Sequence, residues 1–272
     1  MTDIEMEEHG AIWVIRLNRP ERRNSFTPEM LDDWVAMVDR FAADGDARVL
    51  VTTAAGPAFS VGLDLAGRVP IDAPPTLNYE MQKRMHRLGL AMDRLDKPTL
   101  ASVNGMAIGA GMDVALQSDI RIMARSASMT EGYIRAGLIP GNGGAFYLAR
   151  LVGIARALEL LWTARTLSAD ECLAWGIASH VVDDDQLQAA TMDLAASIAA
   201  AIPAAAQMIK RAVYQAADTD LATALHDMAA QMAVIQSSAE SKELVARLRA
   251  QRAAADQAGK ADQAGKADKE PR

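Results

Sequence analysis

The chain has 272 residues, half of them apolar, with a formal net charge of −7 and a pI near 5.2. This length allows one large hydrophobic core with an appendage, and the acidic balance argues against nucleic acid as a partner. A single cysteine, Cys172, excludes an internal disulfide and is typical of a reducing compartment. Since the N-terminal segment is acidic and no apolar run reaches membrane-spanning length, we expect a cytoplasmic protein that does not enter a membrane.

The first half of the chain alternates predicted strands and helices. These segments are strands at 11–17 and 48–53, helices at 28–43 and 79–95, and a Pro- and Gly-rich loop at 66–75 that we expect to be mobile. Thr27-Pro28 is typical of a helix start, because Thr caps free amides and Pro fits the first turn. Lys97-Pro98 ends the second helix, since the residue before a proline disfavours the helical conformation.

From Pro98 onward the order strand, glycine turn, helix and strand is repeated. The strands are predicted at 99–103 and 120–124, and the helix at 110–117. Because this order repeats the pattern upstream, the sequence predicts an α/β fold of stacked ββα units rather than one open doubly wound sheet.

Two glycine turns are candidates for an anion-binding pocket. Residues 103–111, VNGMAIGAG, lead from a strand into a helix whose free N-terminal amides favour negative charge. A second turn, FSVGLD at 59–64, can supply a facing amide. Two amides that meet at one oxygen form an oxyanion hole, which stabilises charge that develops on a carbonyl oxygen.

The second half of the chain is predicted to be mostly helical. SADE at 168–171 is a capping box that opens a helix. Beyond residue 185 an Ala-rich helical pattern continues to about residue 254, with a break at Pro203 and apolar faces that need a partner surface. The final residues repeat ADQAGK and predict a disordered polar tail. We therefore divide the chain into a core at 1–200, a helical oligomerisation region at 201–254 and a tail at 255–272.

Six segments of the chain form a recognisable series. They read LNRPERRNSF (17–26), GPAFSVGLDL (56–65), KPTLASVNGMAIGAGMDVALQSDIRI (97–122), GLIPGNGG (137–144), LARLVG (148–153) and LWTARTLSADECLAWGIASHVV (161–182). In this order they resemble the enoyl-CoA hydratase/isomerase (crotonase) superfamily, over roughly residues 10–200. The resemblance implies a crotonase-like spiral of repeated ββα units, followed by C-terminal helices used in trimerisation. The assembly it implies is a homotrimer or a dimer of trimers.

The resemblance also implies a substrate, an acyl-CoA thioester that reacts through an enolate formed at its carbonyl. Coenzyme A enters as part of the substrate, so no separate cofactor is expected. The implied oxyanion donors are the backbone amides of Leu63 and Ala110. The positions implied to contact CoA are Arg22, Arg23, Ser60 and Asp64. The alternative for the two arginines is that they are solvated surface side chains.

The acid–base candidates depart from the hydratase pattern. Asp113 falls where hydratases keep their first catalytic Glu, although an Asp in a first helical turn is also favoured by the helix dipole. The position of the second Glu, four residues before Gly137, holds Tyr133, whose phenol titrates at about 10 and cannot readily replace a carboxylate. Glu131 would share one face of a strand with Tyr133 and could take that role, or it is a surface or structural carboxylate.

His86 is a further candidate base. It falls on the predicted helix before Pro98, where CoA-dependent aromatic dehalogenases carry their base, and a helix-surface histidine is the alternative. The nucleophilic Asp of those enzymes corresponds to Gly141, which argues against dehalogenation. Dienoyl-CoA isomerases also need an acid at that position. No cluster of His, Cys and carboxylate residues predicts a metal site.

Together these residues predict an enzyme that acts on an acyl-CoA, with a hydratase (lyase) preferred. An enoyl-CoA isomerase or a CoA-thioester hydrolase of the same superfamily is the alternative, because Tyr133 replaces the usual second Glu. A non-catalytic acyl-CoA binder or assembly protein is an alternative of another class. The residues do not specify the acyl group.

Overall fold

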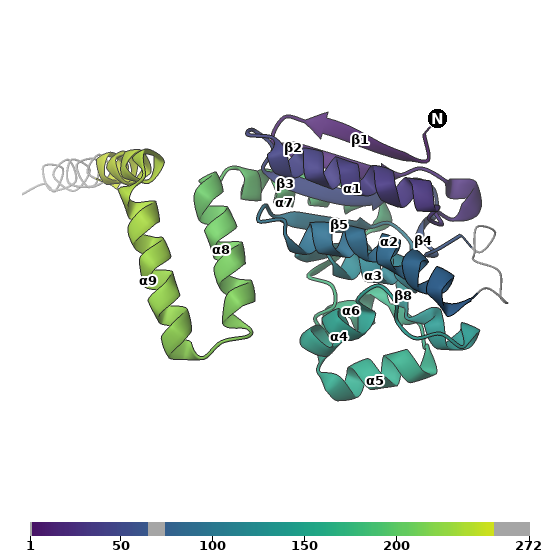
Figure 1. The fold of residues 1–272 in the computed structure, drawn as a ribbon. Coiled ribbons are helices and arrows are strands. Elements are labelled where there is room, and N and C mark those ends of the chain that lie inside the picture. Colours follow the sequence, from purple (N-terminus) through teal and green to yellow (C-terminus); the bar gives the residue numbers. More distant parts are fainter. Residues whose placement is uncertain (1, 65–73, 253–272) are drawn as a thin grey trace, which may run out of the picture. The chain divides into compact units, whose positions relative to one another are not determined.

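The computed structural model describes residues 2–64 and 74–252 (Figure 1). Residues 66–73 of the predicted loop and the whole predicted tail at 255–272 lie outside this part of the chain. The chain divides into two compact units, Met1–Pro203 and Ala204–Arg272. The predicted site residues all belong to the first unit.

The first unit contains two β-sheets. The larger sheet has the order β1-β2-β3-β5-β7-β10 and is parallel apart from the antiparallel β1–β2 pair. Its strands are β1 (Ile4–His9), β2 (Ile12–Leu17), β3 (Val49–Ala54), β5 (Thr99–Val103), β7 (Ile120–Ala124) and β10 (His180–Val182). The smaller sheet has the order β4-β6-β8-β9 and is parallel apart from β8–β9. Its strands are β4 (Ala58–Ser60), β6 (Met106–Ile108), β8 (Ser128–Thr130) and β9 (Leu167–Ser168).

The two sheets alternate along the chain. β3 is followed by β4, β5 by β6 and β7 by β8, so each step crosses from the larger sheet to the smaller one. A helix follows each pair, and these helices are α2 (Pro75–Asp93), α3 (Ala110–Leu116) and, after the short 3-10 helix η3 (Gly132–Ala136), α4 (Gly144–Val152). This arrangement confirms the predicted stack of ββα units.

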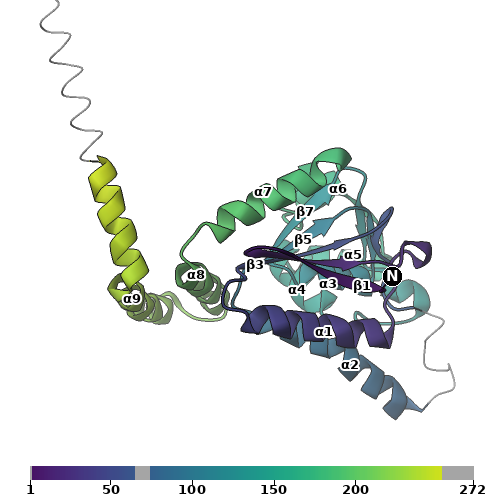
Figure 2. The ribbon, with the colours of Figure 1, turned by 90° about the horizontal axis from the view of Figure 1, so that it is seen from above.

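Helices cover both faces of the larger sheet (Figure 2). α1 (Pro28–Ala43) and α2 lie on one face and α7 (Leu187–Ala199) on the other. The side chains of β2 show that both faces are covered, because successive side chains of a strand point to opposite faces of the sheet. Trp13 and Ile15 belong to the main core, whereas Ile12 and Val14 pack in a second cluster with side chains of α7. The sheet is therefore buried on both sides.

Most predicted elements of the first half are found within a few residues. α1 begins as predicted, and Thr27 accepts a hydrogen bond from the Met30 amide at 3.2 Å. The strand predicted at 48–53 is β3, one residue later, and the helix predicted at 79–95 begins earlier, at Pro75. β1 was not predicted. It is an edge strand whose outward positions carry Glu, so its apolar alternation is short.

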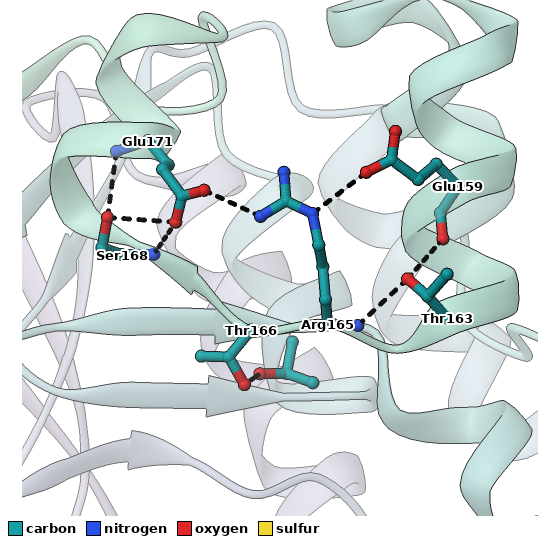
Figure 3. A network of polar contacts seen from close by, with 7 residues as sticks. Glu159, Thr163, Arg165, Thr166, Ser168 and Glu171 are labelled. Carbon is teal, nitrogen blue, oxygen red and sulfur yellow. Dashed lines mark hydrogen bonds and ion pairs between the residues drawn. The ribbon is translucent and has the colours of Figure 1, made fainter.

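The segment that joins α5 (Ile154–Thr163), β9 and α6 (Ala169–Ala174) is held by a polar network (Figure 3). The predicted capping box is confirmed, since Ser168 and Glu171 satisfy each other's backbone amides. Arg165 lies between two helices and pairs with Glu159 at 3.1 Å and Glu171 at 2.8 Å. The network lies beside β9, the neighbour of β8, and because its ion pairs are exposed each of them contributes little to stability.

The second unit is helical. After α8 (Pro203–Ala216) come α9 (Leu221–Ser237) and a further helical stretch at 239–252. The predicted break near Pro203 is present, and two more breaks precede residues 221 and 239. Asp220 caps α9 through its side chain. In the described residues no single helix has the length and hydropathy to cross a membrane, although α7 with its preceding turn and α8 would pass that test as a bent pair.

Candidate active site

Three segments converge on one buried pair of carboxyl groups. α3 places Asp113 in its first turn, the chain leaving β8 places Glu131, and the N-terminus of α4 places Gly144 between them. Neither carboxyl group is accessible, with Asp113 0% and Glu131 2% exposed. An ideal Cβ at Gly144 would lie 2.4 Å from Asp113 Oδ1 and 2.5 Å from Glu131 Oε1. Glycine at 144 is therefore what allows the two acids to meet.

The two glycine turns predicted to form the oxyanion hole lie side by side. Gly62 has φ of +85°, and an ideal Cβ on it would lie 3.2 Å from the Ala110 nitrogen. Gly109, with φ of +54°, precedes Ala110 at the start of α3, and both conformations favour glycine. Because α3 begins at Ala110, its amide has no partner within the helix.

The Leu63 amide is also left unpaired by the local backbone. Phe26 donates to Gly62 O and accepts from the Asp64 amide, each at 2.8 Å, so Leu63 turns its own polar groups away from this pairing. Within residues 2–64 and 74–252, no hydrogen bond from the Leu63 or Ala110 amide is found. The structure thus places two free amides on neighbouring turns, as an oxyanion hole requires.

Burial controls the protonation of the carboxyl pair. Burial raises the pKa of Asp113 to about 6, opposed by the hydrogen bond from Tyr133, by the adjacent Glu131 and by the nearby amides of Asn142 and Gly144. Burial and the adjacent Asp113 charge raise the pKa of Glu131 to about 10. Of the two carboxyl groups, Glu131 therefore keeps its proton to the higher pH. A protonated Glu131 can donate to Asp113, which two carboxylates could not do.

Tyr133 belongs to this cluster, but the predicted strand that would carry it is wrong. β8 ends at Thr130, Glu131 occupies the N-cap position of η3 without a side-chain capping hydrogen bond, and Tyr133 lies within that 3-10 helix. The Tyr133 hydroxyl donates to Asp113 Oδ2 at 2.5 Å, and its ring lies 3.7 Å from an ideal Cβ at Gly109. Burial and the Asp113 charge raise the pKa of Tyr133, so it acts as a donor that favours the ionised form of Asp113.

The loop before α4 is held by two side chains from other helices. His86 Nε2 lies 2.7 Å from Gly141 O, and Gln117 Nε2 donates to Asn142 O at 3.2 Å. A carbonyl oxygen only accepts, so this His86 nitrogen carries a proton and is not free to act as a base. His86 is exposed on α2, as the surface alternative had it.

The four predicted CoA-contacting residues fall into two groups. Arg22 and Arg23 are exposed after β2, and their contact with CoA stays a prediction. Ser60 is fully buried, donates to Asn24 O at 2.7 Å and accepts from the Gly62 amide at 3.1 Å. The Ser60 hydroxyl thus fixes the Gly62 turn, and a contact of Ser60 with CoA stays a prediction.

Asp64 is also occupied within the protein. Its carboxylate pairs with Arg19 at 3.2 Å, and both side chains are largely buried. A carboxylate would in addition repel the phosphates of CoA. Asp64 thus holds the end of the Gly62 turn against the segment that carries Arg22 and Arg23.

Sequence reasoning missed the residues that connect these parts. Asn24 is buried in a left-handed conformation with φ of +53° and donates to Ala55 O and Ala58 O at 2.8 Å. Asn142 is 4% exposed, and neither its side-chain nitrogen nor its oxygen has a partner in the described residues. Asn142 and Gly144 lie in the GLIPGNGG motif, and the glycine-rich spacing of that motif was the available signal. The described residues contain no group of three His, Cys, Asp or Glu side chains that could hold a metal ion.

Comparisons with known proteins agree with this geometry. A family model described as enoyl-CoA hydratase/isomerase matches residues 7–253. The chain is 36% identical over 217 residues to 1,2-epoxyphenylacetyl-CoA isomerase of Escherichia coli, covering 79% of this chain and 83% of that protein. It is 29% identical over 228 residues to short-chain-enoyl-CoA hydratase of Clostridium acetobutylicum, covering 83% and 86%. The crystal structure of an enoyl-CoA hydratase from Bacillus anthracis matches with a TM-score of 0.88 and 27% identity, covering 92% and 97%.

Proposed function

Because this chain belongs to the enoyl-CoA hydratase/isomerase family, whose members act on acyl-CoA thioesters, we propose that it is a hydratase (lyase) that adds water to a 2-enoyl-CoA. The observation that carries this proposal is the polar surroundings of Asp113. Its Oδ1, both oxygens of Glu131 and both side-chain polar atoms of Asn142 are buried without a partner in the described residues. Buried polar atoms are normally satisfied, and a water that also serves as substrate would satisfy them.

The reaction can be written with the groups in place. The thioester oxygen accepts hydrogen bonds from the Leu63 and Ala110 amides. Asp113 takes a proton from water while the water oxygen bonds to the β-carbon, and the electron pair of the C=C bond moves onto the thioester oxygen. The enolate then returns its electron pair to the α-carbon, which receives a proton from the carboxyl pair. The two amides and the N-terminus of α3 stabilise the enolate oxygen.

Double-bond isomerisation is the second candidate, and one observation favours it. Tyr133 occupies Asp113 Oδ2, which leaves a single oxygen, Oδ1, to act on the substrate. One base is enough to move a proton between two carbons.

Turnover separates these candidates. Purified protein would be mixed with crotonyl-CoA and with a 3-enoyl-CoA while the absorbance of the conjugated thioester is followed. A hydratase removes that absorbance from crotonyl-CoA, whereas an isomerase creates it from the 3-enoyl-CoA. Binding of acyl-CoA without turnover of either substrate would instead support the non-catalytic binder.

A pair of variants tests the assigned base. Asp113→Asn should lower kcat by about 10²–10⁴, the usual contribution of a general base. Asp193→Asn, which removes an exposed carboxylate of α7, is the matched control and should leave turnover unchanged. If Asp113→Asn retained full activity, Asp113 would not be the base.

A further inference from the structure

We propose that Asp113 and Glu131 act as one acid–base unit that holds a single proton at rest, with Glu131 as the positioning residue that donates this proton to Asp113. Asp113 remains the group that touches the substrate. This inference rests on the hydratase function proposed above and specifies how its base stays charged in a buried site.

The first support is the geometry around Gly144. One oxygen of each carboxyl group lies within 2.5 Å of the same point, the ideal Cβ position of Gly144. Glu131 is buried, and neither of its oxygens has a hydrogen-bond donor among the described residues. A Glu131 carboxylate without a donor would repel the adjacent Asp113 carboxylate in a medium of low polarity. A proton on one of them removes this repulsion and creates the missing donor.

The second support is the asymmetry of the donors. Tyr133 donates to Asp113 and not to Glu131, and the amides of Asn142 and Gly144 also lie beside Asp113. Hydrogen bonds to the ionised form stabilise it, so the negative charge stays on Asp113 and the proton stays on Glu131. Tyr147 of α4 is near enough to feel the Asp113 charge, and burial raises its pKa to about 12, so it adds no charge.

The proton count balances over one turnover. The unit starts with one proton, on Glu131. It takes a second proton from water as the water oxygen bonds to the β-carbon, and both acids are then neutral beside the enolate. One proton passes to the α-carbon as the C–H bond forms, and the unit returns to one proton without exchange with solvent. Loss of the Glu131 proton would place a second negative charge beside the enolate and oppose its formation.

The pH dependence of kcat/KM tests this unit, because it reports the groups of the free enzyme. The wild type should lose activity below about pH 6, where Asp113 takes a proton, and above about pH 10, where Glu131 loses one. Glu131→Gln keeps a donor but cannot ionise. We expect kcat about tenfold lower, because a neutral amide is a weaker donor to a carboxylate than a carboxylic acid. The alkaline limb should be absent.

Glu131→Ala provides the contrast. It removes the donor to Asp113, so the acid limb should move to higher pH and kcat near neutrality should fall about a hundredfold. Glu159→Gln, at an exposed position of α5, is the matched control and should leave both limbs in place.

The outcomes are distinguishable. A Glu131→Gln variant that keeps the wild-type alkaline limb, or that has the wild-type kcat, would overturn the shared-proton unit. The same holds if Glu131→Ala leaves the acid limb in place. Failure of the proposed function would look different, since the wild type itself would then hydrate none of the 2-enoyl-CoA substrates.

Discussion

The protonated Glu131 should make the stability of the fold depend on pH in a way that needs no substrate to detect. The pKa of Glu131 is raised from 4.5 in an exposed glutamate to about 10 in the fold. A group whose pKa is higher in the folded chain than in the unfolded chain stabilises the fold fully at a pH below its unfolded pKa. This stabilisation is lost as the pH rises through its folded pKa. Between these limits the folded chain holds one more proton than the unfolded chain.

The magnitude follows from that single proton. Each pH unit lowers the free energy of unfolding by about 1.4 kcal/mol, so two units cost about 3 kcal/mol. Asp113 has a folded pKa of about 6, so it is ionised in both states above that pH and adds little to the slope. Glu131 therefore dominates the slope from about pH 7 to about pH 9. Toward pH 9 the Cys172 thiol, whose pKa burial raises from 9.0 to about 12, adds a smaller part that the wild type and a Glu131 variant share.

Urea denaturation of the wild type and Glu131→Gln across this window gives the two slopes, at one fixed protein concentration. The glutamine side chain does not titrate, so the variant should lack the loss of about 1.4 kcal/mol per pH unit. Glu171→Gln is the control. Hydrogen bonds from the Ser168 amide and Arg165 lower the pKa of Glu171, so it is ionised in both states throughout the window. This variant should change the free energy of unfolding by the same amount at every pH, so the slope of that free energy against pH should stay the same. Equal slopes for the wild type and Glu131→Gln would refute a buried, protonated Glu131.

Three further substitutions have defined outcomes. Gly111→Ala would place a Cβ 2.2 Å from the Ser60 carbonyl oxygen, so a thermal melt should show a loss of at least about 1–3 kcal/mol and activity should fall with the displaced oxyanion turn. Tyr133→Phe removes a donor that lowers the pKa of Asp113, so the acid limb of kcat/KM should move to higher pH; an unmoved limb would contradict that role. Ser168→Ala breaks the capping box of α6 and should cost about 1 kcal/mol in urea denaturation, with kcat unchanged.

Features fixed by neighbouring residues were predicted from the sequence. Thr27-Pro28 begins α1 because capping and the proline φ are local properties. The glycines at 62 and 109 adopt positive φ, which fits turns that leave amides free. The order of strands and turns indicated the stacked ββα units, because each strand and turn is also recognised from neighbouring residues. These signals need no knowledge of distant contacts.

The acid–base cluster could not be predicted in the same way, because its members meet only in three dimensions. The strand expected to carry Glu131 and Tyr133 ends at Thr130, and a 3-10 helix brings both side chains to Asp113 instead. Glu131 and Tyr133 thus lie close together, but not because side chains alternate along a strand. The bracing role of Ser60 was not predicted either, since nothing in the sequence distinguishes a hydroxyl that braces a turn from one that contacts a ligand.

Gly144 is the residue that explains why Asp113 and Glu131 can lie together. Glu131 by itself fits a surface carboxylate as well as a buried acid, and its neighbours in sequence do not decide between them. Position 144 distinguishes the two alternatives, because a side chain there would occupy the space in which the two carboxyl groups meet. A chain with alanine at 144 would have to move or lose one acid, and the remaining one would then be a single buried carboxyl without its proton donor. The glycine, rather than either acid, therefore determines whether this site contains one carboxyl group or a pair that shares a proton.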